Sequence, residues 1–183
     1  RAQFYHISMT NSITRWQGDK VNGMPDHPLT LPPPHPFIPI PPTPLIGRER
    51  ELAELGELLH NPQYRLITIL GAGGMGKTRL SLATATQQAT RFANGVAFVP
   101  LAAIPNATFL AHTILQALTQ PLRGDHDPAH QLLDFLRPQQ LLLVLDNYEP
   151  LLPNVTLLHE LLTQVAGLTL LVTSRERLAL QAE

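Results

Sequence analysis

No cysteine occurs among the 183 residues of the chain, which excludes a disulfide framework and any metal site built on thiolates. This absence fits a reducing compartment, so we expect a cytoplasmic protein. An excess of charge of one sign is also lacking, because 13 Lys and Arg residues face 14 Asp and Glu residues, for a formal net charge of −1. Such a balance gives no electrostatic attraction to nucleic acid or to an anionic membrane. Composition therefore names no partner.

Long hydrophobic runs are missing as well. The longest, such as LLLVL at 141–145, are far shorter than the roughly 20 residues that a membrane-spanning helix needs, so we expect no membrane partner. A length of 183 residues supports one full hydrophobic core, which predicts a single domain with appendages. The chain begins with Arg1 rather than methionine and shows no signal-peptide pattern, and we expect it to be a piece of a longer polypeptide.

Proline, by contrast, is abundant and concentrated. Residues 25–44 read PDHPLTLPPPHPFIPIPPTP and hold more than half of the 18 prolines. Because proline lacks a backbone donor and favours the extended polyproline II conformation, this segment is predicted to be a semi-rigid linker. A ligand for an SH3 or WW module is the alternative.

Residues 1–24 precede the linker and are interpreted as the remnant of another domain. The stretch SITRWQ at 12–17 has helical character, and the glycine after it can end a helix. The pattern resembles the second half of a helix-turn-helix, in which Ser12, Thr14 and Arg15 would face DNA. A frayed tail with one amphipathic turn is the alternative. Any DNA partner is thus expected to bind through a separate domain.

After residue 44 the sequence alternates between strand-like and helix-like segments. Strands that are apolar throughout and separated by helices are typical of a parallel sheet covered on both faces, so the predicted fold class is α/β. Helical spacing predicts helices at 47–60, 77–93, about 108–119, about 129–136 and 155–166. Apolar runs predict strands at 65–70, 96–101, 140–146 and 168–175.

The segment GAGGMGKT at 71–78 satisfies the pattern GxxxxGK[ST] between a predicted strand and a predicted helix. Glycines permit positive φ and leave no Cβ in the way, so consecutive backbone N–H groups can turn inward and bind a phosphate. The helix N-terminus favours the same anion, and Lys77 would reach the β- and γ-phosphate oxygens. Thr78 offers a hydroxyl to Mg²⁺. A glycine-rich turn that precedes a lysine by chance is the alternative.

The strand LLLVLD would place Asp146 at the C-terminal edge of the sheet, where ligands bind in open α/β folds, and its carboxylate would hold Mg²⁺. An aspartate that only forms a turn is the alternative. Asn147 follows where many P-loop ATPases have a second acid, and an amide cannot accept the proton of the attacking water. Glu149 is a candidate substitute, so slow hydrolysis is expected.

The strand LLVTSR ends in Arg175 at the same edge of the predicted sheet. A cation there would contact the γ-phosphate and sense its loss. A solvated arginine at a strand end is the alternative.

Four stretches together resemble the STAND class of signal-transduction ATPases, which includes NB-ARC switches and the AfsR- and LuxR-type regulators. They are LIGREREL at 45–52, GAGGMGKT at 71–78, LLLVLDNYE at 141–149 and LLVTSRERL at 170–178. The resemblance implies a P-loop NTPase domain over 45–183, a three-layer sandwich with a mostly parallel sheet, incomplete at its C-terminus. It also implies an ATP/ADP-controlled switch that hydrolyses ATP slowly with Mg²⁺ and self-associates in the full-length protein.

The resemblance further implies roles for individual residues. Catalytic roles fall to Lys77, Asp146 and Arg175, and the metal ligands would be Thr78 and Asp146. The residues near the adenine would be Leu45, Ile46, Gly47 and Arg48, and those around the phosphates would be Gly71, Gly73, Gly74, Met75, Gly76, Lys77, Thr78 and Arg79.

In this class the phosphate-loop strand lies between the fourth and fifth strands of the sheet, and this chain ends at Glu183, before a fifth strand. The phosphate-loop strand is therefore expected at an open sheet edge with unpaired amides, which favours self-association and poor solubility.

Two other functions remain open at this point. One is a P-loop kinase in which LRGDHDP at 122–128 is a substrate loop and Asp125 or Asp127 is the base. The other is a binding module in which the nucleotide is only structural. A switch would retain ADP and lose ATP slowly, whereas a kinase would release ADP only with an acceptor.

Overall fold

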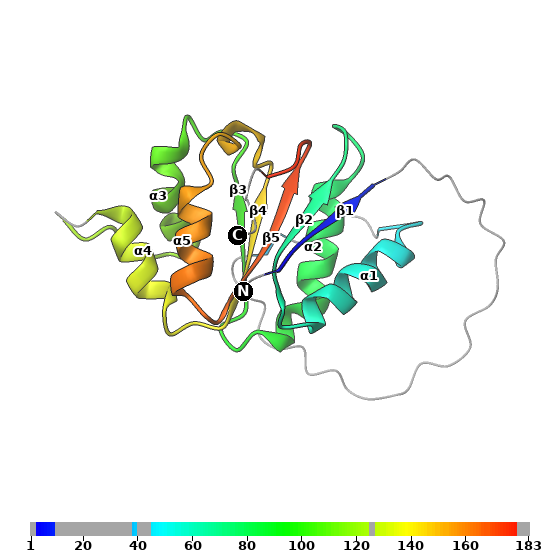
Figure 1. Ribbon diagram of the computed structural model, residues 1–183, viewed down its shortest axis with the longest axis horizontal. Coiled ribbons are helices and arrows are strands. Elements are labelled where there is room, and N and C mark those ends of the chain that lie inside the picture. The colour runs from blue at the N-terminus through cyan, green and yellow to red at the C-terminus, as the bar shows by residue number, and fades with distance from the viewer. Residues whose placement is uncertain (1–2, 10–37, 40–44, 125–126, 179–183) are drawn as a thin grey trace.

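A computed structural model of the chain describes residues 3–9, 38–39, 45–124 and 127–178. Its centre is a five-stranded sheet in which every neighbouring pair of strands is parallel, in the order β1-β2-β5-β4-β3 (Figure 1). The strands are β1 Gln3–Ser8, β2 Tyr64–Leu70, β3 Val96–Pro100, β4 Leu141–Asp146 and β5 Leu168–Ser174.

Helices cover both faces of this sheet. Helices α1 and α2 lie on one face, and α3, α4 and α5 lie on the other (Figure 1). The α-helices are α1 Glu49–His60, α2 Lys77–Gln88, α3 Leu110–Ala117, α4 Pro128–Leu136 and α5 Thr156–Gln164. Three single-turn 3₁₀-helices, at Ala89–Arg91, Ala107–Phe109 and Glu149–Leu151, extend or join them.

The two faces of the sheet are built by the alternation of side chains along each strand. In β4, Leu143 and Leu145 pack into the core beneath α3, α4 and α5, while Leu142 and Val144 pack into the core beneath α1 and α2. All four are fully buried, which is why the strand is apolar throughout. The predicted α/β class and three-layer arrangement are confirmed.

The strand β1 was not predicted, and it overturns the expected open edge. Residues 4–8 pair in continuous parallel register with residues 66–70, so β2 lies between β1 and β5. The Met9 N–H also donates to the Leu70 carbonyl over 2.9 Å. The backbone groups of β2 on that side are therefore paired, and the expectation of self-association through an unpaired β2 was wrong in its physical basis.

The other expectations for the N-terminal region fall largely outside the described residues. The helix-turn-helix interpretation of the predicted remnant 1–24 depends on Ser12, Thr14 and Arg15, which lie outside the described residues. Within the predicted linker only residues 38–39 are described, and Ile38 packs against the core beneath α1 and α2. Residues 3–8, which lie within the predicted N-terminal remnant, form strand β1 of the central sheet.

A partly buried arginine closes the end of the sheet opposite the phosphate loop. Arg65 in β2 donates to the carbonyls of Leu162, Val165 and Leu168, with distances of 2.8 Å to the first and 3.1 Å to the last. These carbonyls include orphan acceptors at the C-terminus of α5 and its exit turn, so the guanidinium caps the helix. Burial lowers the pKa of Arg65 from its usual value.

Gly167 carries a stability prediction. A Cβ at this position would lie 2.3 Å from the backbone oxygen of Gln139, and neither backbone segment can give way cheaply. Gly167→Ala is expected to destabilise the fold by about 1–3 kcal/mol, or about 2–12 °C in melting temperature. Thermal unfolding followed by circular dichroism measures this. The exposed neighbour Ala166→Ser is the control and should stay within about 0.5 kcal/mol of wild type, and an equally mild effect of Gly167→Ala would contradict the predicted clash.

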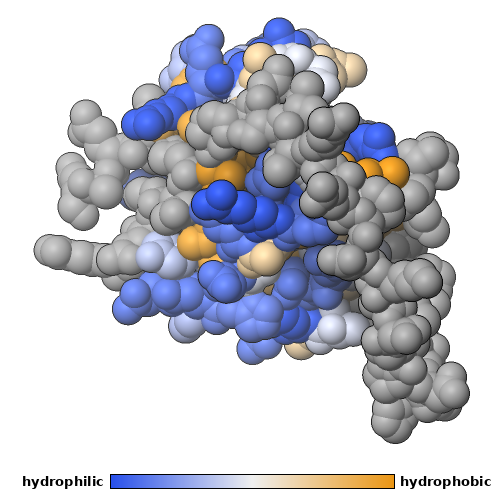
Figure 2. Space-filling view, turned by 90° about the vertical axis from the view of Figure 1, so that its right-hand side faces the viewer, coloured by the Kyte–Doolittle hydropathy of each residue, from blue (hydrophilic) through white to orange (hydrophobic). Residues whose placement is uncertain are grey.

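One face of the molecule can be followed in a space-filling view. On the side of β1 and α1, the described residues are mostly hydrophilic, with small separate hydrophobic areas (Figure 2). Among the described helices, none has both the length and the apolar character needed to cross a membrane.

Candidate nucleotide-binding site

The phosphate loop joins β2 to α2 at the C-terminal ends of the parallel strands (Figure 1). Gly74 and Gly76 have φ values of 78° and 84°, a left-handed conformation that favours glycine. Gly76 is also the N-cap residue of α2, so the helix begins directly at the loop. Around Gly71, an added Cβ would meet the Met9 Cβ at 3.3 Å and the Met75 Sδ at 3.4 Å. The glycines therefore allow the backbone conformation that an anion-binding loop requires.

Lys77 places a buried ammonium group in this loop. Its side chain is 9% exposed, and Nζ donates to the carbonyls of Gly71 over 2.7 Å and Ala72 over 3.1 Å. Within the described part of the chain, no carboxylate forms an ion pair with it. A buried cation held only by neutral carbonyls is costly, and an anion at the loop would supply the missing countercharge.

Thr78 and Asp146 come together although 68 positions separate them in the sequence. The Thr78 hydroxyl lies 2.8 Å from Asp146 Oδ1 and 2.9 Å from Oδ2. One hydroxyl and one carboxylate are the oxygen donors that Mg²⁺ takes beside phosphate oxygens and water. The residues therefore fit a nucleotide-bound Mg²⁺, and in the described residues no cluster of three or more His, Asp or Glu offers another metal site.

Arg175 lies between the phosphate loop and Glu149. Three atoms of its guanidinium group are 3.6–3.9 Å from the position of a Cβ on Gly73. Its Nε is 3.6 Å from Glu149 Oε1, and the arginine side chain is 62% exposed while that of Glu149 is 19% exposed. Both carboxylate oxygens of Glu149 are buried and accept no hydrogen bond in the described structure. The predicted sensor arginine is therefore at the loop, beside an acid.

Residues 45–48 make contacts other than those that join the phosphate loop, Asp146 and Arg175. Leu45 packs against the core that also receives Met75, but Ile46 is 80% exposed. The Gly47 N–H donates to Glu49 Oε1 over 3.1 Å, and Arg48 forms an ion pair with Glu51 over 2.6 Å. These contacts shape the start of α1, and the predicted adenine contacts stay a prediction.

Comparison with known proteins places this site in a family. The family model for the NACHT domain matches residues 65–183, which include the phosphate loop, Asp146 and Arg175. The chain belongs to the NACHT family. NACHT domains are P-loop NTPases of the STAND class, so the coarser part of the predicted resemblance is confirmed.

Relatives of the NACHT domain occur in mycobacteria. A Mycobacterium bovis protein whose name places it among the HTH-type transcriptional regulators is 38% identical over 122 residues, which is 66% of this chain and 14% of that protein. An uncharacterized protein of Mycobacterium tuberculosis is 33% identical over 142 residues, or 77% of this chain and 36% of that protein. The chain thus spans well under half of either relative.

Solved structures support the fold of the NACHT domain. Cdc6p from Pyrobaculum aerophilum matches with a TM-score of 0.55 at 23% identity, over 74% of this chain and 40% of that one. The ADP form of the Aeropyrum pernix ORC2 protein matches with a TM-score of 0.57 at 19% identity, over 78% and 44% of the two chains.

The prediction of site residues missed Thr173, whose role depends on the turn after β4. Asn147 adopts a left-handed φ of 66°, and its N–H donates to the Thr173 hydroxyl over 2.9 Å. The only sequence signal was that β5 ends in polar residues. Tyr148 follows in the same turn and is fully buried, with its hydroxyl donating to the Asn154 carbonyl over 3.2 Å. Burial raises the pKa of Tyr148, which therefore stays neutral.

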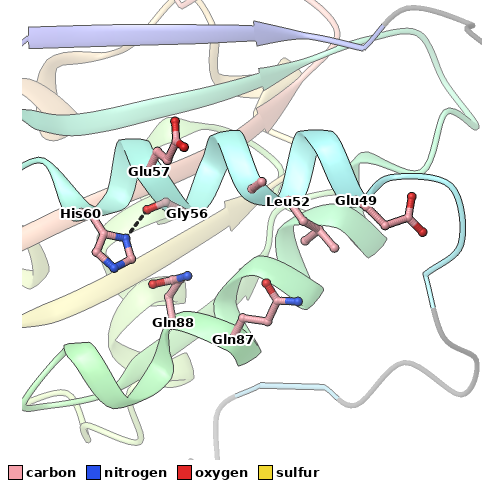
Figure 3. Close-up of a pocket in the computed structure, with 8 residues that line it drawn as sticks. Glu49, Leu52, Gly56, Glu57, His60, Gln87 and Gln88 are labelled. Carbon is pink, nitrogen blue, oxygen red and sulfur yellow. Dashed lines mark hydrogen bonds between the residues drawn. The ribbon is translucent and has the colours of Figure 1, made fainter. Parts of the chain in front are cut away.

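A separate groove of about 700 Å³ lies between α1 and α2 (Figure 3). Gly56 allows the close approach of the helices, since a Cβ there would be 3.3 Å from Gln88 Nε2. His60 closes one end, with Nδ1 2.5 Å from the Gly56 carbonyl. The groove contains none of the predicted phosphate or metal ligands, so it is not the predicted site; its lining residues are Glu49, Leu52, Ala53, Gly56, Glu57, His60, Gln87 and Gln88.

Proposed function

We propose that this chain is the ATP/ADP-binding switch domain of a longer regulatory protein of the NB-ARC, AfsR and LuxR-type kind. The name of the Mycobacterium bovis relative supports a role in transcriptional regulation, and the chain covers only 14% of that protein. DNA would then be bound by another domain of the full-length protein. Nucleotide exchange would control self-association of that protein.

The observation that carries this proposal is the contact of 2.8–2.9 Å between the Thr78 hydroxyl and the Asp146 carboxylate, beside a buried Lys77. The glycine loop after β2 and the end of β4 meet there. They bring together the oxygen atoms of Thr78 and Asp146 and the ammonium group of Lys77, which has no countercharge among the described residues. The structures of the ORC2 protein, which share the fold, were solved in an ADP form and as ADPNP-ADP complexes. The same end of the sheet would bind the nucleotide here.

Each residue of the site has a role in this proposal. The loop amides from Gly73 to Thr78 bind the phosphates, and Lys77 neutralises their charge. Thr78 and Asp146 hold Mg²⁺, which neutralises charge on the β- and γ-phosphates when it is bound. Arg175 contacts the γ-phosphate and distinguishes ATP from ADP. The residues 45–48 and Arg79 complete the nucleotide contacts.

Hydrolysis in this proposal is slow because the acid next to Asp146 is missing. Asn147 cannot accept a proton. Glu149 is a carboxylate that could do so: both of its oxygens are buried without a hydrogen-bond partner in the described structure, and Oε1 lies 3.6 Å from Arg175 Nε. We propose that it polarises the attacking water, and that its ion pair with Arg175 keeps it from doing so efficiently.

The kinase alternative has lost support. Asp127, one of its two candidate bases, is the N-cap residue of α4, and its carboxylate accepts the His130 N–H over 3.2 Å. A carboxylate engaged in a helix cap has a structural explanation. Asp125, the other candidate, lies outside the described residues.

Glu149→Gln tests the proposal. The amide keeps the size of the side chain and cannot act as a base, so ATP turnover is expected to fall about 100-fold or more while ATP affinity changes little. Turnover is measured as phosphate release from ATP with Mg²⁺, and affinity with a fluorescent nucleotide. Glu176→Gln, exposed at the same strand end, is the matched control and should keep wild-type turnover.

A second measurement separates the functions from one another. Wild-type protein that retains ADP and turns over ATP slowly without an acceptor supports a switch. Turnover that depends on a small-molecule acceptor would indicate a kinase instead. Failure to bind ATP or ADP at all would refute the proposed function.

A further inference from the structure

Thr173 links the ends of β4 and β5 behind the Thr78–Asp146 contact. Its side chain is 1% exposed. The hydroxyl donates to Asp146 Oδ1 over 2.7 Å and accepts the Asn147 N–H over 2.9 Å. A threonine hydroxyl has a single hydrogen to donate, and here that hydrogen is committed to the carboxylate.

The same threonine holds the turn that follows β4. Asn147 is left-handed there, which asparagine tolerates better than most residues. Its N–H ends on the Thr173 hydroxyl, and the N–H of Tyr148 donates to the Thr173 carbonyl over 3.0 Å. Two consecutive amides of the turn are thus fixed by one residue of β5. The direction in which the chain continues to Glu149 is set by these two bonds.

Asp146 therefore accepts hydrogen bonds from the hydroxyl groups of two different elements. Thr78 lies in the first turn of α2, is exposed, and is itself a proposed metal ligand. Thr173 is buried in the sheet and has no such second role. Among the hydrogen bonds that the described residues make to Asp146, the one from Thr173 is independent of what Thr78 binds.

We infer that Thr173 is a positioning residue of this site, whose buried hydroxyl orients Asp146 so that nucleotide binds more tightly with Mg²⁺ than without it. The inference rests on the proposed function. A threonine that only stabilised the turn would affect folding and would weaken nucleotide binding equally with and without Mg²⁺. The ratio of the two affinities separates these roles.

Thr173→Val tests the inference in the full chain. Loss of a hydrogen bond to a charged group is expected to reduce the affinity gain from Mg²⁺ about 10- to 100-fold, with ADP affinity in EDTA unchanged. Thr173→Ser keeps the hydroxyl and should restore the gain to within about threefold of wild type. Thr68→Val is the matched control, because Thr68 is a fully buried threonine of β2 whose hydroxyl has no partner in the described structure. It should leave the gain unchanged.

The affinities for ADP are measured by calorimetry with Mg²⁺ and with EDTA, and folding by circular dichroism. If the valine variant does not fold, Thr173→Cys, which keeps the size with a poor donor, should show the same loss that serine does not. The inference is overturned if Mg²⁺ raises the ADP affinity of Thr173→Val as much as that of wild type, or if the variant loses ADP affinity equally with and without Mg²⁺. Either result leaves the proposed function standing. A wild-type protein that binds no nucleotide in either condition overturns both.

Discussion

Lys77→Ala is expected to lower the affinity for ATP and for ADP at least about thirtyfold. The ammonium is 9% exposed, and its hydrogen bonds in the structure go to the carbonyls of Gly71 and Ala72. Bound phosphate would replace neutral acceptors with charged ones in a partly dry loop, where charge-assisted hydrogen bonds are strongest. Without the ammonium, phosphate charge in the loop would lose the cation that is buried there among the described residues.

Titration of a fluorescent ADP analogue measures the effect. Because a buried cation without a countercharge destabilises the fold, the nucleotide-free variant should melt at or above the wild-type temperature, so a loss of affinity is not a loss of folding. Arg137→Ala removes a cation that pairs with Asp134 on the surface of α4 and is the control, with unchanged affinity. Equal affinity of Lys77→Ala and wild type would refute the assignment of the site.

Local sequence patterns predicted the phosphate loop and Asp146, but they did not predict the hydrogen bonds that hold the turn after β4. The phosphate loop is contiguous in the sequence, and Asp146 ends an apolar strand, so chain spacing and the parallel sheet place both at one edge. The orientation of Glu149 depends instead on the left-handed Asn147 and on its bond to Thr173, 26 positions away. No local pattern encodes that bond. The contacts of the stretch 45–48 likewise depend on how a loop packs.

The fold was predictable where an element carries its own signal. Apolar runs located β2, β3, β4 and β5 to within a residue or so of their observed ends. Helix α2 ends at Gln88, short of the expected residue 93, because the chain tightens into a 3₁₀ turn at Ala89–Arg91. The strand β1 was missed because its partner β2 lies more than 50 residues away, beyond a proline-rich segment. A six-residue strand with one distant partner has no periodicity long enough to detect.

Ile7→Asp is the prediction that follows from this strand. Ile7 is 4% exposed, pairs with Ile69 of β2, and packs into the core beneath α1 and α2. A carboxylate at that position would be buried without a partner at a cost of about 3–5 kcal/mol, unless β1 leaves the sheet. In either case the melting temperature is expected to fall by roughly 6 °C or more.

If β1 leaves the sheet, the edge of β2 becomes unpaired, and the self-association expected for an open edge should appear in this variant. Size-exclusion chromatography with light scattering measures it, and the expected result is a shift of Ile7→Asp to larger species than wild type forms at the same concentration. Ile7→Val is the control, because it removes one methylene at a cost of about 0.5–1.5 kcal/mol and keeps the strand in place. An Ile7→Asp variant with wild-type mass and melting temperature would mean that residues 3–8 do not hold the edge of β2. In that case the hydrogen bond from the Met9 N–H to the Leu70 carbonyl would not support the phosphate loop, which follows β2 directly.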